Sequence, residues 1–416
     1  MDFIKFSLKK LASMALMTSL FFTQAYAVEK IIDETTVDKD KKDTSMQQVL
    51  NWVPGSTGFM FPGEPLPKDQ IRVTIMGSGW GYYRPAQGGA SIYVELGNGE
   101  SFIFDVGDGS TGNYKKMQVP YSKMTNIFLT HLHLDHIGDL PDLWAFGPST
   151  DRITPLNIYG PSGDTPELGT KYAIENMKKY ANWNLVSFEA SLPASEGFKI
   201  NVHEFDYKAN PGIVYDKNGV VIKSFPAVHT IDGAVSYRLN WNGMSVVISG
   251  DTNPSMFMIE NAKGADIILH ETAPLPRFMI EKMGYKPDVA ERIVDSSHTP
   301  PKALGKIFQL TKPRMGVITH TLRNTDTIGP VTDLVRIHYK GPLVFGADLM
   351  VFNISKDKIV QRMGVGPDYP WMYLLVPQPN TKPARKLSDY KSKALLKEVI
   401  SKCNAKDDKQ NGKICY

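Results

Sequence analysis

Residues that could bind metal ions are concentrated in one short segment, residues 130–139, which reads Thr-His-Leu-His-Leu-Asp-His-Ile-Gly-Asp. Zinc binds histidine nitrogen and carboxylate oxygen readily. His131 and His133 alternate at the end of an expected strand, so both imidazoles can face one point. Asp135 and His136 follow and can serve a second point close by. Two metal ions about 3.5–4 Å apart form a clamp for hydrolytic displacement. The segment therefore predicts a dinuclear hydrolytic centre, with a cluster of surface or capping histidines as the alternative.

Three further residues with the same ligand chemistry occur later in the chain, each at the end of an apolar, strand-like run. They are His229, Asp251 and His320. Each lies where a buried strand releases the chain into a loop, so the three can meet the first segment at one edge of the sheets. Together these seven residues complete two metal sites, and neither site contains a cysteine.

The segments that must position these residues have the patterns of strands joined by tight turns. Asn-Gly pairs at 98–99, 218–219 and 242–243 predict three β-hairpins. Helices are expected at residues 300–310 and 330–339. Hairpins followed by strand–helix alternation predict an α/β (α+β) fold, with two sheets and helices on the outside faces. Strands are expected at residues 71–76, 91–96, 101–104, 127–130, 198–205, 212–215, 220–223, 234–239, 244–249, 265–269, 315–319 and 343–354.

The composition is that of an ordinary globular chain of 416 residues, 42% hydrophobic and 22% charged. The chain has 47 Lys and Arg against 43 Asp and Glu, a net charge of +4, which does not indicate a strongly cationic nucleic-acid binder. Two cysteines exclude a disulfide scaffold. Cys403 and Cys415 can still close a small loop near the C-terminus in an oxidising compartment.

Both ends of the chain are expected to lie outside the folded domain. Residues 1–27 have the lysines, the short apolar run and the small residues of a secretory signal peptide, with cleavage after Ala27. The apolar run is shorter than the ~20 residues of a membrane span, so no stable membrane insertion is expected. The mature chain, of net charge +2, would be periplasmic or secreted. The expected divisions are an irregular leader at residues 28–69, the hydrolase domain at residues 70–360 and a basic, helical C-terminal extension at residues 361–416.

In the order of its motifs the sequence resembles the metallo-β-lactamase superfamily. A glycine-bounded segment, Phe104-Asp105-Val106-Gly107-Asp108-Gly109, precedes the histidine cluster, and a single His, Asp and His follow it. The resemblance implies a four-layer αββα sandwich with two zinc ions at one edge, or Mn²⁺ or Fe²⁺ in their place. A bridging water or hydroxide would be the nucleophile. The implied ligands are His131, His133 and His229 for one metal, Asp135, His136 and His320 for the other, and Asp251 between them.

Two later segments narrow the resemblance to the ribonuclease Z and arylsulfatase-like branch. They are residues 265–272, Ala-Asp-Ile-Ile-Leu-His-Glu-Thr, and residues 297–303, Ser-His-Thr-Pro-Pro-Lys-Ala. The branch implies that His298 donates to the scissile oxyanion or the leaving group, and that Glu271 orients His298. Asp135 would hold and orient the attacking hydroxide, which gives three expected catalytic residues.

The expected reaction is hydrolysis of a sulfate or phosphate ester, because a dinuclear centre neutralises the anionic oxygens around sulfur or phosphorus. An exported, arylsulfatase-like hydrolase of a small anionic ester combines the branch motifs with the signal peptide. Trp80, Tyr82, Tyr83 and Trp144 lie beside the motif loops and suit an aromatic substrate, unless they only pack. No nucleic-acid partner is expected, and a homodimer is left open.

The alternative is a ribonuclease Z-like phosphodiesterase or endonuclease. It fits the motifs but conflicts with export, and residues 163–225 contain no Gly-, Lys- or Arg-rich arm to grip RNA. A cyclic-nucleotide phosphodiesterase pattern starts alike but departs at Asp139. A lactamase or lactonase ranks lower, because Glu271 and His298 have no role in a true lactamase and the bridging position is Asp251. A metal-binding protein without turnover also ranks low, because no ligand is missing.

Overall fold

The computed structural model describes residues 58–81, 84–189 and 195–367, all within the compact unit Pro54–Tyr416. The expected signal peptide, most of the leader, the C-terminal helix and the cysteine pair fall outside the described residues, as do Tyr82 and Tyr83. In the three described ranges, no helix is both long and apolar enough to cross a bilayer.

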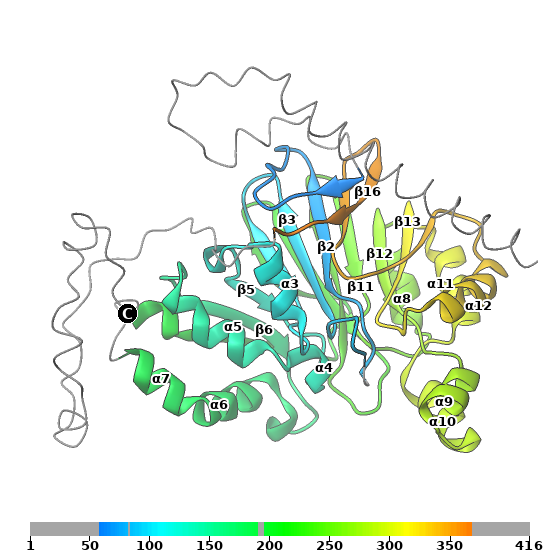
Figure 1. Cartoon of the computed structure of the whole chain (residues 1–416), viewed down its shortest axis with the longest axis horizontal. Coiled ribbons are helices and arrows are strands. Elements are labelled where there is room, and N and C mark those ends of the chain that lie inside the picture. Colours follow the sequence, from blue (N-terminus) through cyan, green and yellow to red (C-terminus); the bar gives the residue numbers. More distant parts are fainter. Residues whose placement is uncertain (1–57, 82–83, 190–194, 368–416) are drawn as a thin grey trace, which may run out of the picture. The chain divides into compact units, whose positions relative to one another are not determined.

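Two sheets with parallel and antiparallel pairs form the centre of the described fold (Figure 1). The first sheet has the strand order β1-β16-β15-β2-β3-β4-β5-β6-β7. Its strands are β1 (Phe59–Met60), β2 (Ile71–Gly77), β3 (Ser91–Leu96), β4 (Ser101–Phe104), β5 (Asn126–Phe128), β6 (Leu156–Pro161), β7 (Ile200–Phe205), β15 (Met350–Ile354) and β16 (Ile359–Gly364).

The second sheet has the order β14-β13-β12-β11-β10-β9-β8. It begins as an antiparallel meander and continues with parallel strands, which is the change of rhythm expected from the sequence. Its strands are β8 (Gly212–Lys217), β9 (Val220–Pro226), β10 (Val235–Trp241), β11 (Met244–Ile248), β12 (Ile267–Glu271), β13 (Met315–Thr319) and β14 (Leu343–Phe345).

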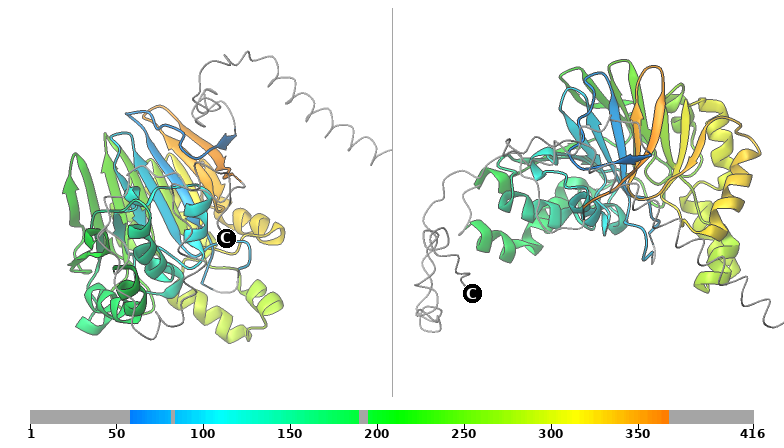
Figure 2. Two further views of the ribbon diagram at one scale, coloured as in Figure 1. Left: turned by 60° about the vertical axis from the view of Figure 1, so that its left-hand side comes forward. Right: turned by 45° about the horizontal axis from the view of Figure 1, so that its top comes forward.

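Helices cover the outer face of each sheet (Figures 1 and 2). On the first sheet lie α3 (Ser110–Lys116), α4 (Leu134–Ile137), α5 (Leu140–Phe146), α6 (Thr170–Tyr180) and α7 (Asn182–Glu189). On the side of the second sheet lie α8 (Met256–Ala262), α9 (Pro276–Met283), α10 (Pro287–Ser297), α11 (Pro301–Thr311) and α12 (Thr325–Arg336). Short 3₁₀ helices occur at Tyr121–Lys123, Gly147–Ser149, Pro166–Leu168 and Ser195–Phe198.

Three layers of buried apolar side chains hold the sheets and helices together. Between the sheets, residues such as Val73 of β2 pack with residues such as Val246 of β11. Between the first sheet and its helices, Leu143 of α5 belongs to a second cluster, and Phe308 of α11 belongs to the matching cluster on the second sheet. Both sheets are therefore covered on both faces, which confirms the expected αββα sandwich.

Most strands have the expected positions, and the differences have local causes. Helix α11 begins one residue later than expected, because Thr299 is used elsewhere: its N–H donates to Glu271 and its hydroxyl donates to the carbonyl of Thr252. Helix α12 begins before Pro330, because Asn324 caps it with a capping box. The expected strand pair at 343–354 is β14 and β15, which belong to different sheets.

Some elements were not predicted from the sequence. Strand β6 ends in Gly-Pro, a pair typical of loops, and helices α3 to α10 were also not predicted, although α6 and α10 are as long as α11. Strand β1 lies within the segment expected as an irregular leader, and strand β16 runs past residue 360.

Candidate metal centre

The segments that follow four strands, including the short helix α4, bring the seven candidate ligands to one edge of the sandwich. The first group of potential ligand atoms, all within 4.8 Å of one another, comes from His131, His133, His229 and Asp251. The second group, equally close, comes from Asp135, His136, Asp251 and His320. The segments that carry them follow β5, β9, β11 and β13, so both sheets contribute. These groups can hold metal ions, and each of the seven ligand candidates named from the sequence lies in at least one of them.

Among the residues that the structure describes, Asp251 alone belongs to both groups. Its side chain is 3% exposed, and its Oδ1 lies 3.2 Å from Nε2 of His136 and 3.1 Å from Nε2 of His320. Its Oδ2 lies 3.9 Å from Nε2 of His131 and 3.9 Å from Nε2 of His229. One carboxylate therefore faces both groups, which is the geometry of a bridging ligand.

Asp105 accepts hydrogen bonds from residues of the histidine cluster and so fixes their positions, a role that the sequence did not reveal. This buried carboxylate accepts the backbone N–H of Thr130 at 2.7 Å and the hydroxyl of Thr130 at 2.7 Å. Its Oδ2 lies 2.8 Å from Nδ1 of His136, which donates to it. The contact fixes the ring so that Nε2 faces the centre, as in a metal-bound histidine with an anionic partner. The glycine-bounded Asp105 was part of the recognised motif, but the motif alone did not show which atoms it holds.

Two other histidines are oriented in a similar way. Because the Thr130 hydroxyl donates to Asp105, it accepts from Nδ1 of His131, 3.1 Å away. Nδ1 of His229 lies 2.8 Å from the carbonyl oxygen of Ser297 and donates to it. In both rings Nε2 is left facing the ligand group, so the tautomers suit metal binding.

The electrostatics of the centre favour a cation. Burial lowers the pKa of His229 to about 4, so its ring is neutral at pH 7, the form that binds metal. Burial would raise the pKa of Asp251, but His320 and His136 hold it well below its usual range. Burial opposes a charge on His136, yet the carboxylates of Asp251 and Asp105 outweigh it and hold its pKa well above the usual value. The carboxylates therefore draw positive charge into the site.

Unsatisfied atoms give a second test of fit. Among the described residues, Nε2 of His136, Nε2 of His320 and Oδ1 of Asp251 are buried without a hydrogen-bond partner. Leaving such an atom unsatisfied costs about 1–3 kcal/mol. The three atoms face one another, so a single cation would satisfy all of them. The residues present therefore fit a metal ion.

His298 and Glu271 lie beside the two groups, as expected. Nδ1 of His298, which follows α10, lies 3.4 Å from Oε2 of Glu271 and 3.8 Å from Oδ2 of Asp251. Glu271, at the end of β12, is fully buried, and its Oε1 accepts the backbone N–H groups of Thr252 and Thr299 at 3.1 and 2.9 Å. Glu271 is therefore held from one side and faces His298 with its other oxygen.

The protonation of His298 is subject to opposing influences. Burial lowers its pKa, but Glu271 and then Asp251 outweigh burial and raise the pKa to about 9 in the metal-free chain. The indole N–H of Trp80 opposes a second proton, because it donates to Nε2 of His298 at 3.2 Å. A cation bound by Asp251 would also remove part of the carboxylate's pull on that proton.

The aromatic residues named from the sequence have different surroundings. Trp80 is buried against His298, whereas Trp144 is buried in the layer under α5 and donates to the carbonyl oxygen of Phe198 at 2.9 Å. Trp144 is therefore a packing residue.

His270 belongs to neither ligand group, and its Nδ1 donates to the carbonyl oxygen of Glu271 at 2.7 Å.

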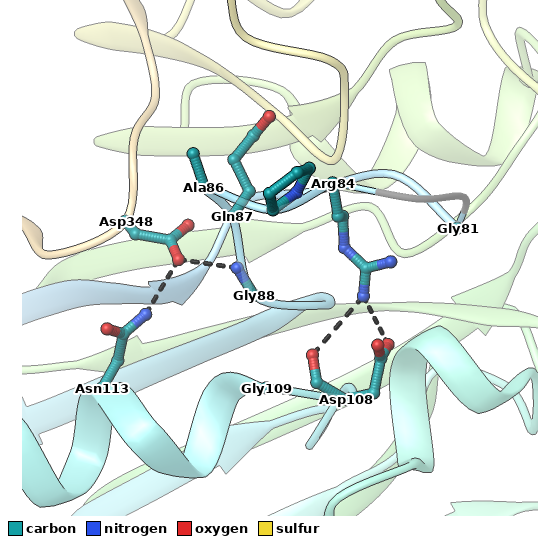
Figure 3. A pocket seen from close by; sticks show the side chains of 10 residues that line it. Gly81, Arg84, Ala86, Gln87, Gly88, Asp108, Gly109, Asn113 and Asp348 are labelled. Atoms are coloured by element: carbon teal, nitrogen blue, oxygen red, sulfur yellow. Dashed lines mark hydrogen bonds and ion pairs between the residues drawn. The ribbon is translucent and has the colours of Figure 1, made fainter. Parts of the chain in front are cut away.

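A pocket of about 820 Å³, whose lining residues Figure 3 shows, lies near Asp135 of the second ligand group. Gly81 forms part of its wall, and a Cβ atom at Gly81 would lie 2.8 Å from Oδ2 of Asp135. Arg84 projects along the wall and pairs with Asp108 (Figure 3). On the opposite side, Asp348 accepts from the N–H of Gly88 at 2.7 Å and from Nδ2 of Asn113 at 2.8 Å. The pocket thus adjoins the centre and has a guanidinium in its wall.

Comparisons with known proteins show what the chain is similar to. Residues 71–277 match the family model described as Anti-Pycsar protein Apyc1. The chain is 32% identical over 205 residues to Ribonuclease Z of Mycobacterium avium, covering 48% of this chain and 69% of that protein. It is 21% identical over 320 residues to Ribonuclease Z of Archaeoglobus fulgidus, covering 69% and 99%. The fold is similar to that of the metallo-beta-lactamase fold protein YhfI from Bacillus subtilis, with a TM-score of 0.51 and 17% sequence identity. The match covers 69% of this chain and 100% of YhfI.

These relatives overturn two expectations drawn from the sequence. The expectation that no nucleic acid is a partner is wrong, and so is the expectation of a small ester substrate, because the curated relatives are ribonucleases. The main, arylsulfatase-like interpretation is not supported, and the ribonuclease Z-like alternative fits better. The expectation was wrong because it used the net charge of the whole chain and the absence of a basic arm. Neither describes the local electrostatic field at a site whose residues can bind cations.

Proposed function

Because the chain belongs to the ribonuclease Z-like branch of the metallo-β-lactamase superfamily, we propose that it hydrolyses phosphodiester bonds of RNA. It is a metal-dependent hydrolase of ester bonds. One observation carries the RNA proposal: a chain 32% identical to a ribonuclease Z places two ligand groups on either side of a shared carboxylate, Asp251. That arrangement suits a phosphodiester, whose charge needs neutralising on both sides of the reacting bond.

The proposed cofactor is a pair of zinc ions. Their ligands would be His131, His133 and His229 on one side, Asp135, His136 and His320 on the other, and Asp251 between them. When bound, the ions would supply an activated water and neutralise the charge of the phosphate. The nitrogen- and oxygen-only ligand set is compatible with zinc and also with Mn²⁺ or Fe²⁺.

Three of the chain's own residues would complete the chemistry. The Asp135 carboxylate, whose Oδ2 lies 3.6 Å from Nε2 of both His136 and His320, would accept a hydrogen bond from the attacking water and orient it. His298 would donate to the negative charge that develops on the scissile oxyanion or the leaving oxygen. Glu271 would orient His298, because its carboxylate is already fixed by two backbone N–H groups.

The pocket beside the centre supports a substrate larger than a simple ester. Its volume of about 820 Å³ is large enough for a nucleotide, and its wall residue Gly81 lies against Asp135. Arg84 in its wall offers a guanidinium, the group that best matches phosphate oxygens. The Arg84 side chain is 7% exposed and its partner Asp108 is 59% exposed, so a phosphate would reach the guanidinium by displacing the Asp108 carboxylate.

We also propose that the protein is exported, on the strength of residues 1–27. Amino-terminal sequencing of the protein recovered from the periplasm or medium should begin at Val28. Recovery only from the cytoplasm with residues 1–27 attached would contradict export and would leave the catalytic proposal unaffected.

The proposed function can be tested by incubating the zinc-loaded protein with matched substrates and measuring which of them it cleaves. A transfer-RNA precursor with a 3′ extension, an unstructured RNA and a DNA of the same sequence would be compared with an aryl sulfate. Cleavage of RNA that disappears in Asp251→Ala is the expected result. Hydrolysis of the aryl sulfate together with intact RNA would overturn the proposal.

A further inference from the structure

Trp80 lies between the candidate catalytic histidine and a neighbouring pair of helices. Its side chain is 1% exposed, and it packs in a cluster with Met279 of α9 and with Ala290 and Val294 of α10. Its indole N–H donates to Nε2 of His298 at 3.2 Å, and the two rings meet edge to face with centroids 5.5 Å apart. Helix α10 ends at the residue before His298, so Trp80 contacts both the imidazole and the helix that leads to it.

The chemistry of indole decides which nitrogen of His298 carries the proton. Indole N–H is a donor and never an acceptor, so Nε2 of His298 must offer its lone pair to Trp80. The proton of the neutral ring therefore lies on Nδ1. On that side the nearest oxygen of Glu271 is Oε2, 3.4 Å away, and neither atom has a hydrogen-bond partner among the described residues. The bond from Trp80 requires this tautomer, and the nearby Glu271 carboxylate, held in place by two backbone N–H groups, favours it and leaves the Nδ1 proton free for another acceptor.

Nδ1 is also the atom of His298 that faces the ligand groups. It lies 3.8 Å from Oδ2 of Asp251, the bridging candidate, whereas Nε2 is occupied by the indole. A phosphate oxygen held at the centre would therefore meet a nitrogen that carries a proton. With the opposite tautomer, the same nitrogen would present a lone pair to a negatively charged oxygen.

We propose that Trp80 is a positioning residue that holds His298 as the Nδ1–H tautomer, so that His298 donates a hydrogen bond from Nδ1 to the reacting phosphate. The catalytic consequence rests on the proposed function, but the tautomer does not. Trp80 itself does not touch the substrate in this scheme. It acts only through the imidazole.

The test separates the N–H group of Trp80 from its bulk. Trp80→Phe keeps an aromatic ring in the cluster with α9 and α10 and removes the donor. Trp144→Phe is the matched control, because Trp144 is equally buried and donates a bond of similar length to the carbonyl of Phe198. Any general cost of removing a buried indole N–H appears in both variants and is measured by thermal unfolding.

The direct readout is ¹⁵N NMR of histidine-labelled protein, with the His298 signals assigned by their loss in His298→Gln. In the unsubstituted protein we expect the proton of His298 on Nδ1, and in Trp80→Phe a mixture with the Nε2–H form. Trp144→Phe should keep the original pattern. A proton found on Nε2 in the unsubstituted protein, or an unchanged pattern in Trp80→Phe, would overturn the proposal.

Kinetics supply the second readout. On RNA, Trp80→Phe should lower kcat about 10- to 100-fold with little change in KM, the usual range for a residue that orients a functional group. On bis(p-nitrophenyl) phosphate, whose leaving group departs readily as an anion, the loss should be much smaller. Equal losses on both substrates, or losses no greater than in Trp144→Phe, would reduce Trp80 to packing. If the unsubstituted protein cleaves no RNA, the proposed function fails and the NMR result still decides the role of Trp80.

Discussion

At the scale of single residues, Asp251 has the largest expected effect, because its two oxygens face different ligand groups. Asp251→Ala should lose metal from both groups and lower RNA cleavage by well over about 100-fold, beyond the usual effect of a residue that merely supports a ligand. Zinc per chain, measured by elemental analysis, should fall with activity. A variant that retained two zinc ions and full activity would show that Asp251 bridges nothing.

Asp105 permits a subtler prediction. In Asp105→Asn a single amide oxygen replaces the two carboxylate oxygens that now serve Thr130 and His136. Metal affinity, measured by competition with a chromogenic chelator, should weaken about 10- to 100-fold. Asp151→Asn is the matched control, since Asp151 is buried and accepts the N–H and hydroxyl of Ser122 in the same manner. An equal loss of affinity in both variants would indicate a general effect of destabilisation.

The residue scale also shows what could be predicted from the sequence. The seven ligand candidates were identified because their types are those that zinc binds and because each follows a strand. The contact of Trp80 with His298 spans 218 positions, and no local pattern encodes it. Asp105 stood in a recognised motif, yet its partners Thr130 and His136 became known only when β4 and β5 were seen side by side.

At the scale of elements, the turn after β11 carries Asp251 and depends on Gly250. Gly250 has φ of 58°, and a Cβ atom there would lie 2.7 Å from Cβ of Thr130. Gly250→Ala should therefore lower the free energy of unfolding by about 1–2 kcal/mol for the left-handed backbone, and by more for the contact. It should also lower the metal content, because the turn and the histidine cluster are pushed apart.

Gly264→Ala provides the control for this prediction. Gly264 has φ of 67°, but nothing lies within 4 Å of its added Cβ atom. The Gly264→Ala variant should lose only the part of the unfolding free energy that comes from the left-handed backbone, measured by denaturant unfolding. It should keep its zinc. If the two variants were equally stable and equally metal-loaded, close packing of the Asp251 turn on Thr130 would not matter.

Elements were predicted well where pattern and turn chemistry agreed and poorly where tertiary contacts decided. The Asn-Gly turn at 242–243 correctly joins β10 and β11. Helix α11 starts after Pro300 because Thr299 is committed to Glu271, a contact that no periodicity contains. Helix α12 includes Pro330, which the sequence suggested as a start, because the preceding capping box had already begun the helix.

At the scale of the whole described fold, the candidate centre joins the two sheets. Its ligands follow β5 of the first sheet and β9, β11 and β13 of the second, so bound ions would link layers that otherwise meet through apolar side chains. The sequence predicted this architecture through motif order, but the substrate class was misjudged, because total charge contains no information on how charges are arranged.

Because bound ions would connect the two sheets, the candidate centre can be tested by removing the metal and measuring stability alone. A chelator should lower the unfolding temperature, and zinc should restore it, because a ligand that binds only the folded state at about 100 times its Kd contributes about 2.7 kcal/mol. The buried atoms of His136, His320 and Asp251 left without partners add to the instability of the metal-free chain. Asp251→Ala should show little response to either treatment. If a chelator lowered the unfolding temperature of Asp251→Ala by the same amount, the stabilising metal would bind elsewhere. The two ligand groups would then not contribute to the stability of the sandwich through a bound metal.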